Sequence, residues 1–453
     1  MKKIILLLFL CISAMAQTIA QAQSWSELGT STNALNANSY IEAMYTDGNG
    51  NVYVAGYFTN TNGKYYVAKW NGTNWSELGA GTGALNANGS ILAMCADANG
   101  NIYVAGTFTN SNTKKYVAKW DGTNWSELGT GTNALNGESF IQALVADGNG
   151  NIYASGGIYN SNSKYYVAKW NGTTWSDLGG VNSINANGLI SYLAIDAAKN
   201  VYATGLFTDA NHERYIAKWD GSSWAPVGTF RTQGSASCLL AKPDGTVYFS
   251  GSFLDANNKY YVVVWDGSNW SELGTGTNAL NANHGLIALT LGQDGNLYAG
   301  GSFTDAAGRY VAKWNGTNWT EIGTGTSALA ANRDITNIHV DATGNVYVTG
   351  EFTNTDGKQY VAKWNNSTAT ATYNKSLKDL ISFYPNPTTD YITIHTPESG
   401  LLKLTDLLGN VVYTQQVDIG TSTISLANIQ AGIYTALFNS KENNYVPVKI
   451  IKE

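Results

Sequence analysis

The chain has 453 residues and a formal net charge of −6. Only 13% of its residues are charged, whereas about 25% is typical of soluble proteins. This composition excludes a coiled coil and a disordered chain, and it excludes a nucleic-acid binder because no basic excess could neutralise phosphates. Its 49 glycines and 12% aromatic residues are typical of many short strands joined by tight polar turns, so we predict an all-β protein.

The N-terminus has the pattern of a secretory signal peptide covering residues 1–22. Two lysines precede an apolar run at 4–12, and small residues allow cleavage after Ala16 or Ala22. The apolar run is too short for a membrane helix, which needs about 20 residues, and no other stretch approaches that length. We therefore expect an exported chain without a transmembrane segment.

An internal repeat of about 50 residues dominates the rest of the chain. The string YVAKWNGTNWSELG begins at Tyr66 and recurs with few changes. Its first tryptophan falls at positions 70, 120, 170, 219, 265, 314 and 364, so seven copies follow one another at spacings of 46 to 50 residues. Each unit contains four strand-like pieces, named a to d here; in the second unit they cover 91–97, 101–108, 115–120 and 125–128. Four antiparallel strands repeated in this way predict the blades of a β-propeller.

The two ends of the repeat predict how the ring closes. The chain opens with SWSELG at residues 24–29, which is a strand d with no strand before it, and the repeat stops after a strand c at Trp364. We expect the orphan strand at Trp25 to complete the last blade, because this pairing would remove the exposed edges of an open array. Residues 23–364 are thus predicted to form a seven-bladed β-propeller closed by an N-terminal strand.

Several of these features resemble Kelch and galactose-oxidase-like propellers. They are the strand that ends in glycine, the aromatic strand c and the tryptophan about five residues later, and they extend from Trp25 to Trp364. The Kelch pattern wants a glycine pair after strand b, which only Gly156-Gly157 and Gly300-Gly301 supply. The histidines and cysteines of this chain do not reproduce the copper-binding motifs of galactose oxidase. The resemblance therefore implies a fold, and we predict no cofactor and no metal.

The C-terminal segment carries a second set of motifs. Its residues are Pro385, Asn386, Pro387, Asp406, Gly409, Gly432, Tyr434, Lys449 and Lys452. In this order they resemble the C-terminal sorting domain of substrates of the type IX secretion system of Bacteroidetes. We place this domain at 380–453, after a Ser- and Thr-rich linker at 365–379. Its short alternating strands predict a small β-sandwich.

The resemblance to sorting domains implies partners and a destination. The partners would be the type IX secretion machinery and its sortase-like peptidase, which removes the domain. The protein would pass through the periplasm and the outer membrane. Release into the medium and attachment to the cell surface both remain open.

We expect any ligand site on the face that carries the d-to-a and b-to-c loops, because these are the longer loops. They are nearly identical between units, which favours repeated shallow binding or none, since a catalytic site needs unlike groups that converge. One unit, Trp224–Trp265, departs from the repeat. The titratable residues clustered near it are the candidate ligand-binding residues His212, Glu213, Arg214, Arg231 and His284. Solvated loop charges are the alternative interpretation.

The divergent unit also lacks two charges found elsewhere. Pro226 replaces the acid of WSELG, and Val264 replaces the lysine of VAKW. Their joint loss predicts that this acid and lysine contact each other across neighbouring blades in the other units, as in Glu77 with Lys119; general divergence of the unit is the alternative. The turn Asp47–Asn51 alternates oxygen-bearing side chains like a calcium loop, but turn chemistry already explains it.

These observations favour a secreted or cell-surface, non-catalytic and monomeric propeller that acts in adhesion or in binding a glycan or a protein. The runner-up is an extracellular polysaccharide hydrolase or lyase on the same scaffold. A pocket on the long-loop face lined by two or more carboxylates and a histidine would favour the enzyme.

Overall fold

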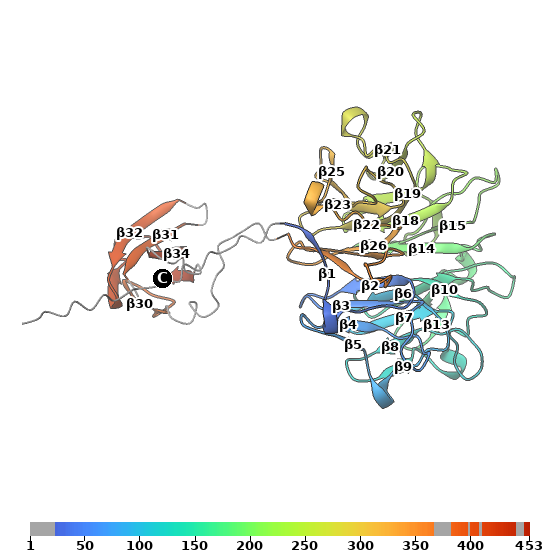
Figure 1. The fold of residues 1–453 in the computed structure, drawn as a ribbon, viewed down its shortest axis with the longest axis horizontal. Helices are drawn as coiled ribbons and strands as arrows, with labels where there is room; N and C mark the ends of the chain where they lie inside the picture. The colour runs from blue at the N-terminus through green and yellow to red at the C-terminus, as the bar shows by residue number, and fades with distance from the viewer. Residues whose placement is uncertain (1–22, 367–381, 397–398, 407–409, 441–447) are drawn as a thin grey trace, which may run out of the picture. The chain divides into compact units, whose positions relative to one another are not determined.

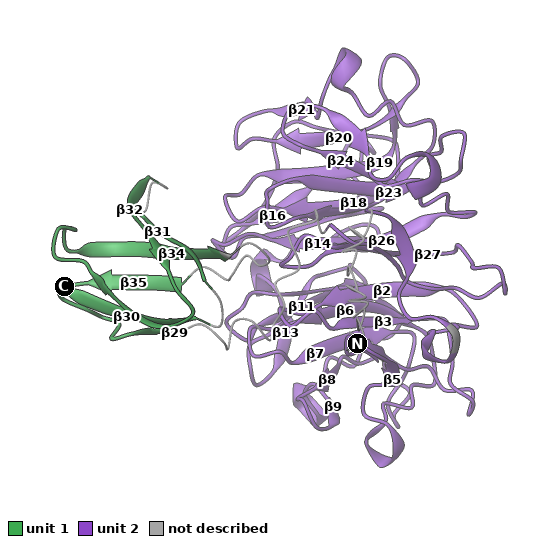
Figure 2. Ribbon diagram, turned by 60° about the vertical axis from the view of Figure 1, so that its left-hand side comes forward, with its two compact units in different colours: residues 1–22, 367–453 green, residues 23–366 purple. Residues whose placement is uncertain are grey.

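The computed structural model describes residues 23–366, 382–396, 399–406, 410–440 and 448–453. The chain divides into two compact units, one of residues 23–366 and one that contains residues 367–453 (Figure 2). The predicted signal peptide, positions 367–379 of the predicted linker and Gly409 lie outside the described residues.

Residues 23–366 form seven four-stranded antiparallel sheets, called blades 1 to 7 here (Figure 1). In each of the first six blades the strand order a, b, c, d follows the chain. Blades 1 to 3 contain β2 (Ile41–Thr46), β3 (Val52–Gly56), β4 (Ala68–Trp70) and β5 (Trp75–Glu77); β6 (Ile91–Ala96), β7 (Ile102–Gly106), β8 (Ala118–Trp120) and β9 (Trp125–Glu127); and β10 (Ile141–Ala146), β11 (Ile152–Gly156), β12 (Ala168–Trp170) and β13 (Trp175–Asp177).

The remaining blades repeat this plan with one exception. Blades 4 to 6 contain β14 (Ile190–Ile195), β15 (Val201–Gly205), β16 (Ala217–Trp219) and β17 (Trp224–Pro226); β18 (Ala236–Ala241), β19 (Val247–Leu254), β20 (Tyr260–Trp265) and β21 (Trp270–Glu272); and β22 (Leu286–Leu291), β23 (Leu297–Gly301), β24 (Ala312–Trp314) and β25 (Trp319–Glu321). Blade 7 combines β26 (Ile335–Val340), β27 (Val346–Gly350) and β28 (Ala362–Trp364) with β1 (Trp25–Glu27) from the start of the chain.

Burial is highest in strand b and lower in the innermost strand a and in the edge strand d. All five residues of β3 are buried, and so are those of β7, β11, β15, β23 and β27, because these strands are covered on both faces by neighbouring blades. Each strand d is only half-buried, as an edge strand is. Most loops that enter strand a contain a short 3₁₀ turn; these turns are Ser31–Asn33, Gly81–Gly83, Gly131–Asn133, Gly180–Asn182, Gly276–Asn278 and Gly325–Ser327.

The repeated tryptophans join each blade to the one before it. In blade 1 the rings of Trp70 and Trp75 lie 5.7 Å apart, and Trp75 Nε1 donates to Leu28 O at 2.8 Å. The tryptophan of strand d makes the same bond to the preceding blade in all seven blades, at 2.7 to 3.2 Å. The glycine after strand d makes room for this packing: a Cβ on Gly79, whose φ is +76°, would lie 2.6 Å from the ring of Trp120. These tryptophans are therefore packing residues of the interfaces between blades.

The first and last blades lie side by side. Trp25 in β1 pairs with Trp364 in β28, and the innermost strands of blades 7 and 1 touch, since Asn337 Nδ2 donates to Glu42 O at 2.8 Å. The first strands of consecutive blades are also in contact from blade 1 to blade 7.

The C-terminal unit contains two antiparallel sheets that share one cluster of buried side chains, among them Ile394, Leu402 and Phe438. One sheet has the order β29 (Ser382–Tyr384), β30 (Tyr391–Thr396) and β33 (Gly420–Ser425). The other has the order β32 (Val411–Val417), β31 (Gly400–Thr405), β34 (Gly432–Ser440) and β35 (Val448–Lys452).

Candidate functional sites

The acid of strand d and the lysine of strand c do not contact each other, so that prediction is wrong. Within blade 1, Glu77 lies opposite Ala68, whereas Lys69 lies opposite Ser76. Neighbouring residues of a strand point to opposite faces, so the acid and the lysine leave the sheet on different sides. Across blades the pairing fails too, because the ammonium group of Lys119 lies over the ring of Tyr103 in its own blade.

The lysine instead belongs to a chain of contacts with the turn between strands a and b. In blade 1, Lys69 Nζ lies 5.4 Å from the centre of the Tyr53 ring, and the Tyr53 hydroxyl donates to Asp47 at 3.2 Å. Burial alone would raise the pKa of Asp47, but hydrogen bonds from Asn51, Asn49 and Tyr53 outweigh it and hold this pKa below its usual range. The Asp47 carboxylate, which suggested a calcium site, thus accepts hydrogen bonds from its own turn.

Blade 5 explains why the strand-c lysine is lost from one unit. Lys242 stands where Asp47 stands in blade 1, and Val264 stands in place of the strand-c lysine. Tyr248 lies between these two positions. Two ammonium groups around one tyrosine would repel each other. The presence of Lys242 therefore explains why the strand-c position holds Val264 and not a lysine.

The acid of strand d lines a pocket at the outer edge of its blade. In blade 1 a cavity of about 340 Å³ is lined by Leu35, Asn60, Tyr66, Trp75 and Glu77, among others. Asn60 Nδ2 donates to Glu77 Oε2 at 3.1 Å, while Glu77 Oε1 is buried without a hydrogen-bond partner. Burial, followed by the charge of Glu77, raises the pKa of Tyr66.

The same Asn and Glu pair recurs in two other blades. Asn110 donates to both carboxylate oxygens of Glu127 at 3.0 and 3.2 Å in blade 2, and Asn354 donates to Glu27 at 3.2 and 3.4 Å in blade 7. A cavity of about 350 Å³ occupies the equivalent edge of blade 4, where Pro226 replaces the acid. These cavities are called the outer pockets below.

Blade 4 also holds most of the residues that the sequence singled out. Arg231 Nε pairs with Asp209 at 2.9 Å and its guanidinium lies over the ring of Tyr215. The hydrogen bond from Arg231 lowers the pKa of Asp209. Asp209 holds the sequence position of Asn60, so Arg231 replaces the missing acid as the partner at this edge.

The other predicted residues are not gathered into one site. Arg214 donates to Gln233 O and thereby helps to hold the short loop that contains Arg231. Glu213 is part of the turn capped by Asp209, and His212 and His284 are exposed on the loops of different blades. Among the described residues, no hydrogen bond or ion pair joins His284 to the other four. A ligand role for these five residues stays a prediction.

The Asn- and Thr-rich loops are alike from blade to blade because their side chains hydrogen-bond to one another. Asn38 Nδ2 donates to Thr59 Oγ1 at 3.1 Å, and Thr59 N donates back to Asn38 Oδ1 at 2.9 Å. Equivalent pairs occur at Asn88 with Thr109 and at Asn283 with Thr304. These side chains fix the long-loop face.

A different cavity, of about 270 Å³, lies where the first strands of all seven blades meet. It is called the axial cavity here. Residues at the second position of these strands line it: Glu42, Leu92, Gln142, Ser191, Ser237, Ile287 and Thr336. Burial, with the charge of Glu351 adding to it, raises the pKa of Glu42 to about 7. Gln142 Oε1 is buried and has no partner.

The loop motifs do not report the axial cavity, which lies between the first strands of the blades. The signal was present in strand a. IEAMYT, ILAMCA and IQALVA begin the first three blades, and their second letters differ, although strands b, c and d are nearly identical.

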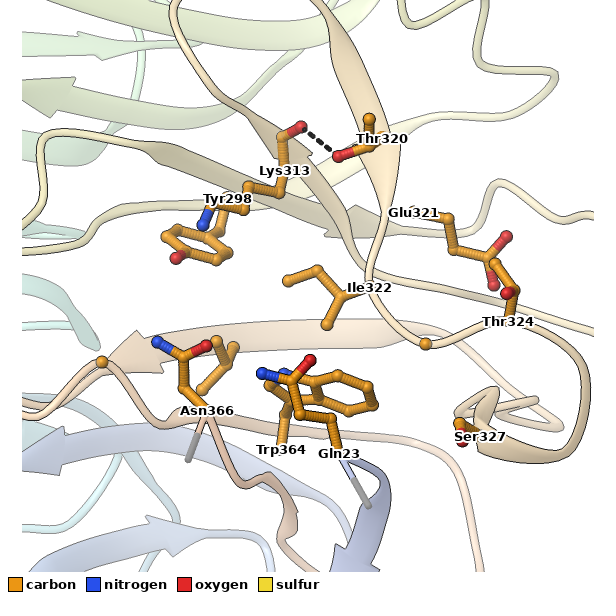
Figure 3. A pocket seen from close by; sticks show the side chains of 13 residues that line it. Gln23, Tyr298, Lys313, Thr320, Glu321, Ile322, Thr324, Ser327, Trp364 and Asn366 are labelled. Atoms are coloured by element: carbon orange, nitrogen blue, oxygen red, sulfur yellow. Dashed lines mark hydrogen bonds between the residues drawn. The ribbon is translucent and has the colours of Figure 1, made fainter. Parts of the chain in front are cut away.

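A larger cavity of about 410 Å³ lies at the seam of blades 6 and 7 (Figure 3). Two of its polar side chains are engaged, since Lys313 pairs with Asp294 at 3.5 Å and Thr320 Oγ1 donates to Lys313 O at 3.4 Å, whereas Glu321 Oε1 is buried without a partner. Elsewhere in the described ranges, no group of three or more His, Cys, Asp or Glu side chains could hold a metal ion.

In the C-terminal unit the predicted sorting residues tie the two ends of the unit together. Asn386 Nδ2 donates to Lys449 O at 2.6 Å, and Ile451 N donates to Asn386 Oδ1 at 2.9 Å. Pro385 and Pro387 flank this asparagine in the segment after β29.

The other described sorting residues hold turns and strand ends. Asp406 accepts from Asn410 N at 2.9 Å, and the Tyr434 hydroxyl donates to Gln430 O at 2.7 Å. Gly432 pairs with Lys452 where β34 meets β35. The motifs are therefore structural elements of this unit.

Comparison with known proteins identifies the C-terminal unit. Residues 382–453 match the family described as "Secretion system C-terminal sorting domain", which confirms the predicted sorting domain. A domain of this kind implies interaction with the type IX secretion machinery and delivery to the cell surface or the extracellular space. No helix in the described part of the chain has the length and apolar character needed to cross a membrane. A search of the curated proteins found no match.

Solved structures resemble the chain in fold. PorZ, a surface component of the type IX secretion system of Porphyromonas gingivalis, is 13% identical with a TM-score of 0.50, and the match covers 92% of this chain and 59% of PorZ. The extracellular domain of a one-component system from B. thetaiotaomicron is 14% identical with a TM-score of 0.50, covering 94% of this chain and 52% of that one. The chain thus spans little more than half of these proteins. The narrower resemblance to Kelch and galactose-oxidase-like propellers stays a prediction. The protein is an all-β chain of seven propeller-like blades that carries a secretion-system C-terminal sorting domain.

Proposed function

We propose that this exported protein is a non-catalytic propeller that binds carbohydrate through its outer pockets and so acts in adhesion. The observation that carries the proposal is the pocket of blade 1, in which Asn60 and Glu77 meet beside Trp75 and Tyr66. An amide and a carboxylate offer hydrogen bonds to sugar hydroxyls. The exposed parts of the half-buried Trp75 and Tyr66 rings offer apolar surface to the C–H faces of a sugar.

Repetition of the pocket suits a polymeric ligand. A shallow site binds a single sugar weakly, but several such sites on one molecule raise the overall affinity for a chain of similar sugars. The sameness of blades 1, 2 and 7 at this edge supports repeated binding and gives no support to a single differentiated catalytic centre.

We further propose that β1 holds the propeller ring shut. Its pairing with β28 supports this, because without β1 the last blade would present an unpaired edge. The Trp25 indole donates to Ile322 O at 3.0 Å, as its counterparts do in the other blades.

The carbohydrate proposal is tested with the full chain on a glycan array, followed by titration with the strongest ligand. Replacing both Glu77 and Glu127 by glutamine should lower the number of ligands bound per chain. The matched control is Glu138→Gln, which removes an exposed carboxylate from a long loop. Unchanged stoichiometry in the double variant would contradict the assignment of the pocket.

A polysaccharide hydrolase or lyase is the second candidate. The observation that favours it is Glu42, whose raised pKa would suit a general acid. The axial cavity has no histidine among its lining residues and one carboxylate, with Glu351 nearby. Release of reducing ends from a polysaccharide by the full chain, and its loss in Glu42→Gln, would establish the enzyme.

A further inference from the structure

The side chains that line the axial cavity do not follow the seven-fold repeat of the blades. Every blade contributes to its lining, and the contributed side chains differ from blade to blade. A single carboxylate, Glu42, is the one charged group in the lining. Within the described residues this set of side chains therefore occurs once, unlike the Asn and Glu pair of the outer pockets.

The cavity offers acceptors that the protein leaves unused. The Glu42 carboxylate accepts no hydrogen bond within the described residues, and Gln142 Oε1 is buried without a partner. Asn337 Nδ2 is committed to Glu42 O, which leaves the side-chain oxygen of Asn337 as a further acceptor. A buried acceptor without a donor is costly, so an occupant that donates hydrogen bonds would stabilise the site.

Charge around the cavity favours a cation. Glu351 faces Glu42 from the segment after β27, and Tyr57 and Tyr192 are the other titratable groups within its electrostatic reach. The basic groups nearby already have partners, because Arg309 pairs with Asp334 at 2.9 Å and Arg333 lies 4.0 Å from Glu351. Nothing in the cavity lining itself neutralises Glu42.

The rest of the lining indicates what the cation is attached to. Met44, Met94, Leu144 and Leu193 give the cavity an apolar wall. Tyr192, whose pKa burial raises to about 12 with the charges of Cys238 and Glu42 adding to it, supplies an aromatic ring. A positive head on an apolar stem matches a carboxylate, an aromatic ring and an apolar wall.

We propose that the axial cavity binds a primary alkylammonium group, with Glu42 as its counter-ion and Gln142 and Asn337 as additional acceptors. This site is separate from the outer pockets and does not depend on carbohydrate binding there.

The test is calorimetric titration of the full chain with pentylamine and with 1-pentanol, which has the same stem without the charge. At pH 8 pentylamine should bind, and 1-pentanol should bind at least tenfold more weakly. Glu42→Gln should weaken pentylamine binding about tenfold or more, which corresponds to at least about 1.4 kcal/mol. Glu138→Gln should leave the affinity unchanged.

Affinity should also follow the ionisation of Glu42. The amine stays protonated throughout, whereas Glu42 loses its charge below its pKa, so binding should weaken several-fold from pH 8 to pH 5.5. Equal affinity for amine and alcohol, equal affinity in wild type and Glu42→Gln, or no binding of millimolar pentylamine at pH 8 would each overturn the proposal. Glycan binding should be the same in Glu42→Gln, so the two proposals fail independently.

Discussion

Removing the charge of Glu42 should stabilise the protein, which is unusual for a substitution in an interior cavity. The pKa of Glu42 is about 7 in the folded protein because burial and Glu351 disfavour its ionised form. In the unfolded chain the group titrates near its usual value of about 4.3. Between these two values the folded state holds the proton more tightly, so stability is greatest at low pH and declines as the pH rises through 7.

The size of the decline follows from the two pKa values. Each unit of difference corresponds to about 1.4 kcal/mol, so ionised Glu42 costs on the order of 4 kcal/mol of folding free energy above pH 7. This is an upper limit, because water in the cavity screens the charge. Glu42→Gln removes the ionisation and keeps the shape of the side chain.

The assay is urea unfolding of wild type, Glu42→Gln and the exposed control Glu138→Gln from pH 5 to pH 9. The stability of Glu42→Gln relative to wild type should increase across this range and level off above pH 8, while the control should run parallel to wild type. A difference in unfolding free energy between Glu42→Gln and wild type that does not change with pH would contradict the raised pKa of Glu42.

Three further predictions concern the ring and its export. Deleting residues 24–29 should lower the melting temperature and promote association through the exposed edge of blade 7; a monomeric variant with an unchanged melting temperature would contradict closure by β1. Ending the chain after Lys378 should leave the propeller in the periplasm, and normal amounts on the cell surface would count against the role of the sorting domain. Trp75→Phe should cost about 1 kcal/mol in urea unfolding, because the indole bond to Leu28 O is lost; unchanged stability would show that this bond contributes nothing.

The repeat unit could be read from the sequence because one physical contact fixes its period. Each strand-d tryptophan donates to the carbonyl of the preceding blade, so its position must recur once per blade. The glycine that follows strand d must recur with it, since the next tryptophan ring fills the space of its Cβ. The sorting residues were readable for a similar reason, because Asn386 bonds the terminal strand directly.

The contacts of individual charges could not be read in the same way. Joint loss of Glu and Lys in one unit suggested a pair across neighbouring blades, but the lysine lies over the tyrosine of strand b in its own blade. In blade 1 the lysine lies over the ring of Tyr53, and Tyr53 in turn bonds Asp47, some twenty residues before the lysine. The sequence sign of these contacts is in blade 5, where Lys242 replaces the aspartate and Val264 replaces the lysine.

Glu42 was missed for a different reason. Its raised pKa depends on the meeting of seven strands around one cavity, and no local pattern reports this. The variability of strand a among otherwise equal units marks the cavity only once the strands are known to converge.

Repeated carbohydrate binding by the outer pockets is tested most directly by native mass spectrometry of the full chain with the oligosaccharide selected on the array. The account predicts a series of complexes with several ligands per chain and similar affinities, because blades 1, 2 and 7 present the same Asn and Glu pair. One ligand per chain at saturation, or no complex with any glycan, would contradict it.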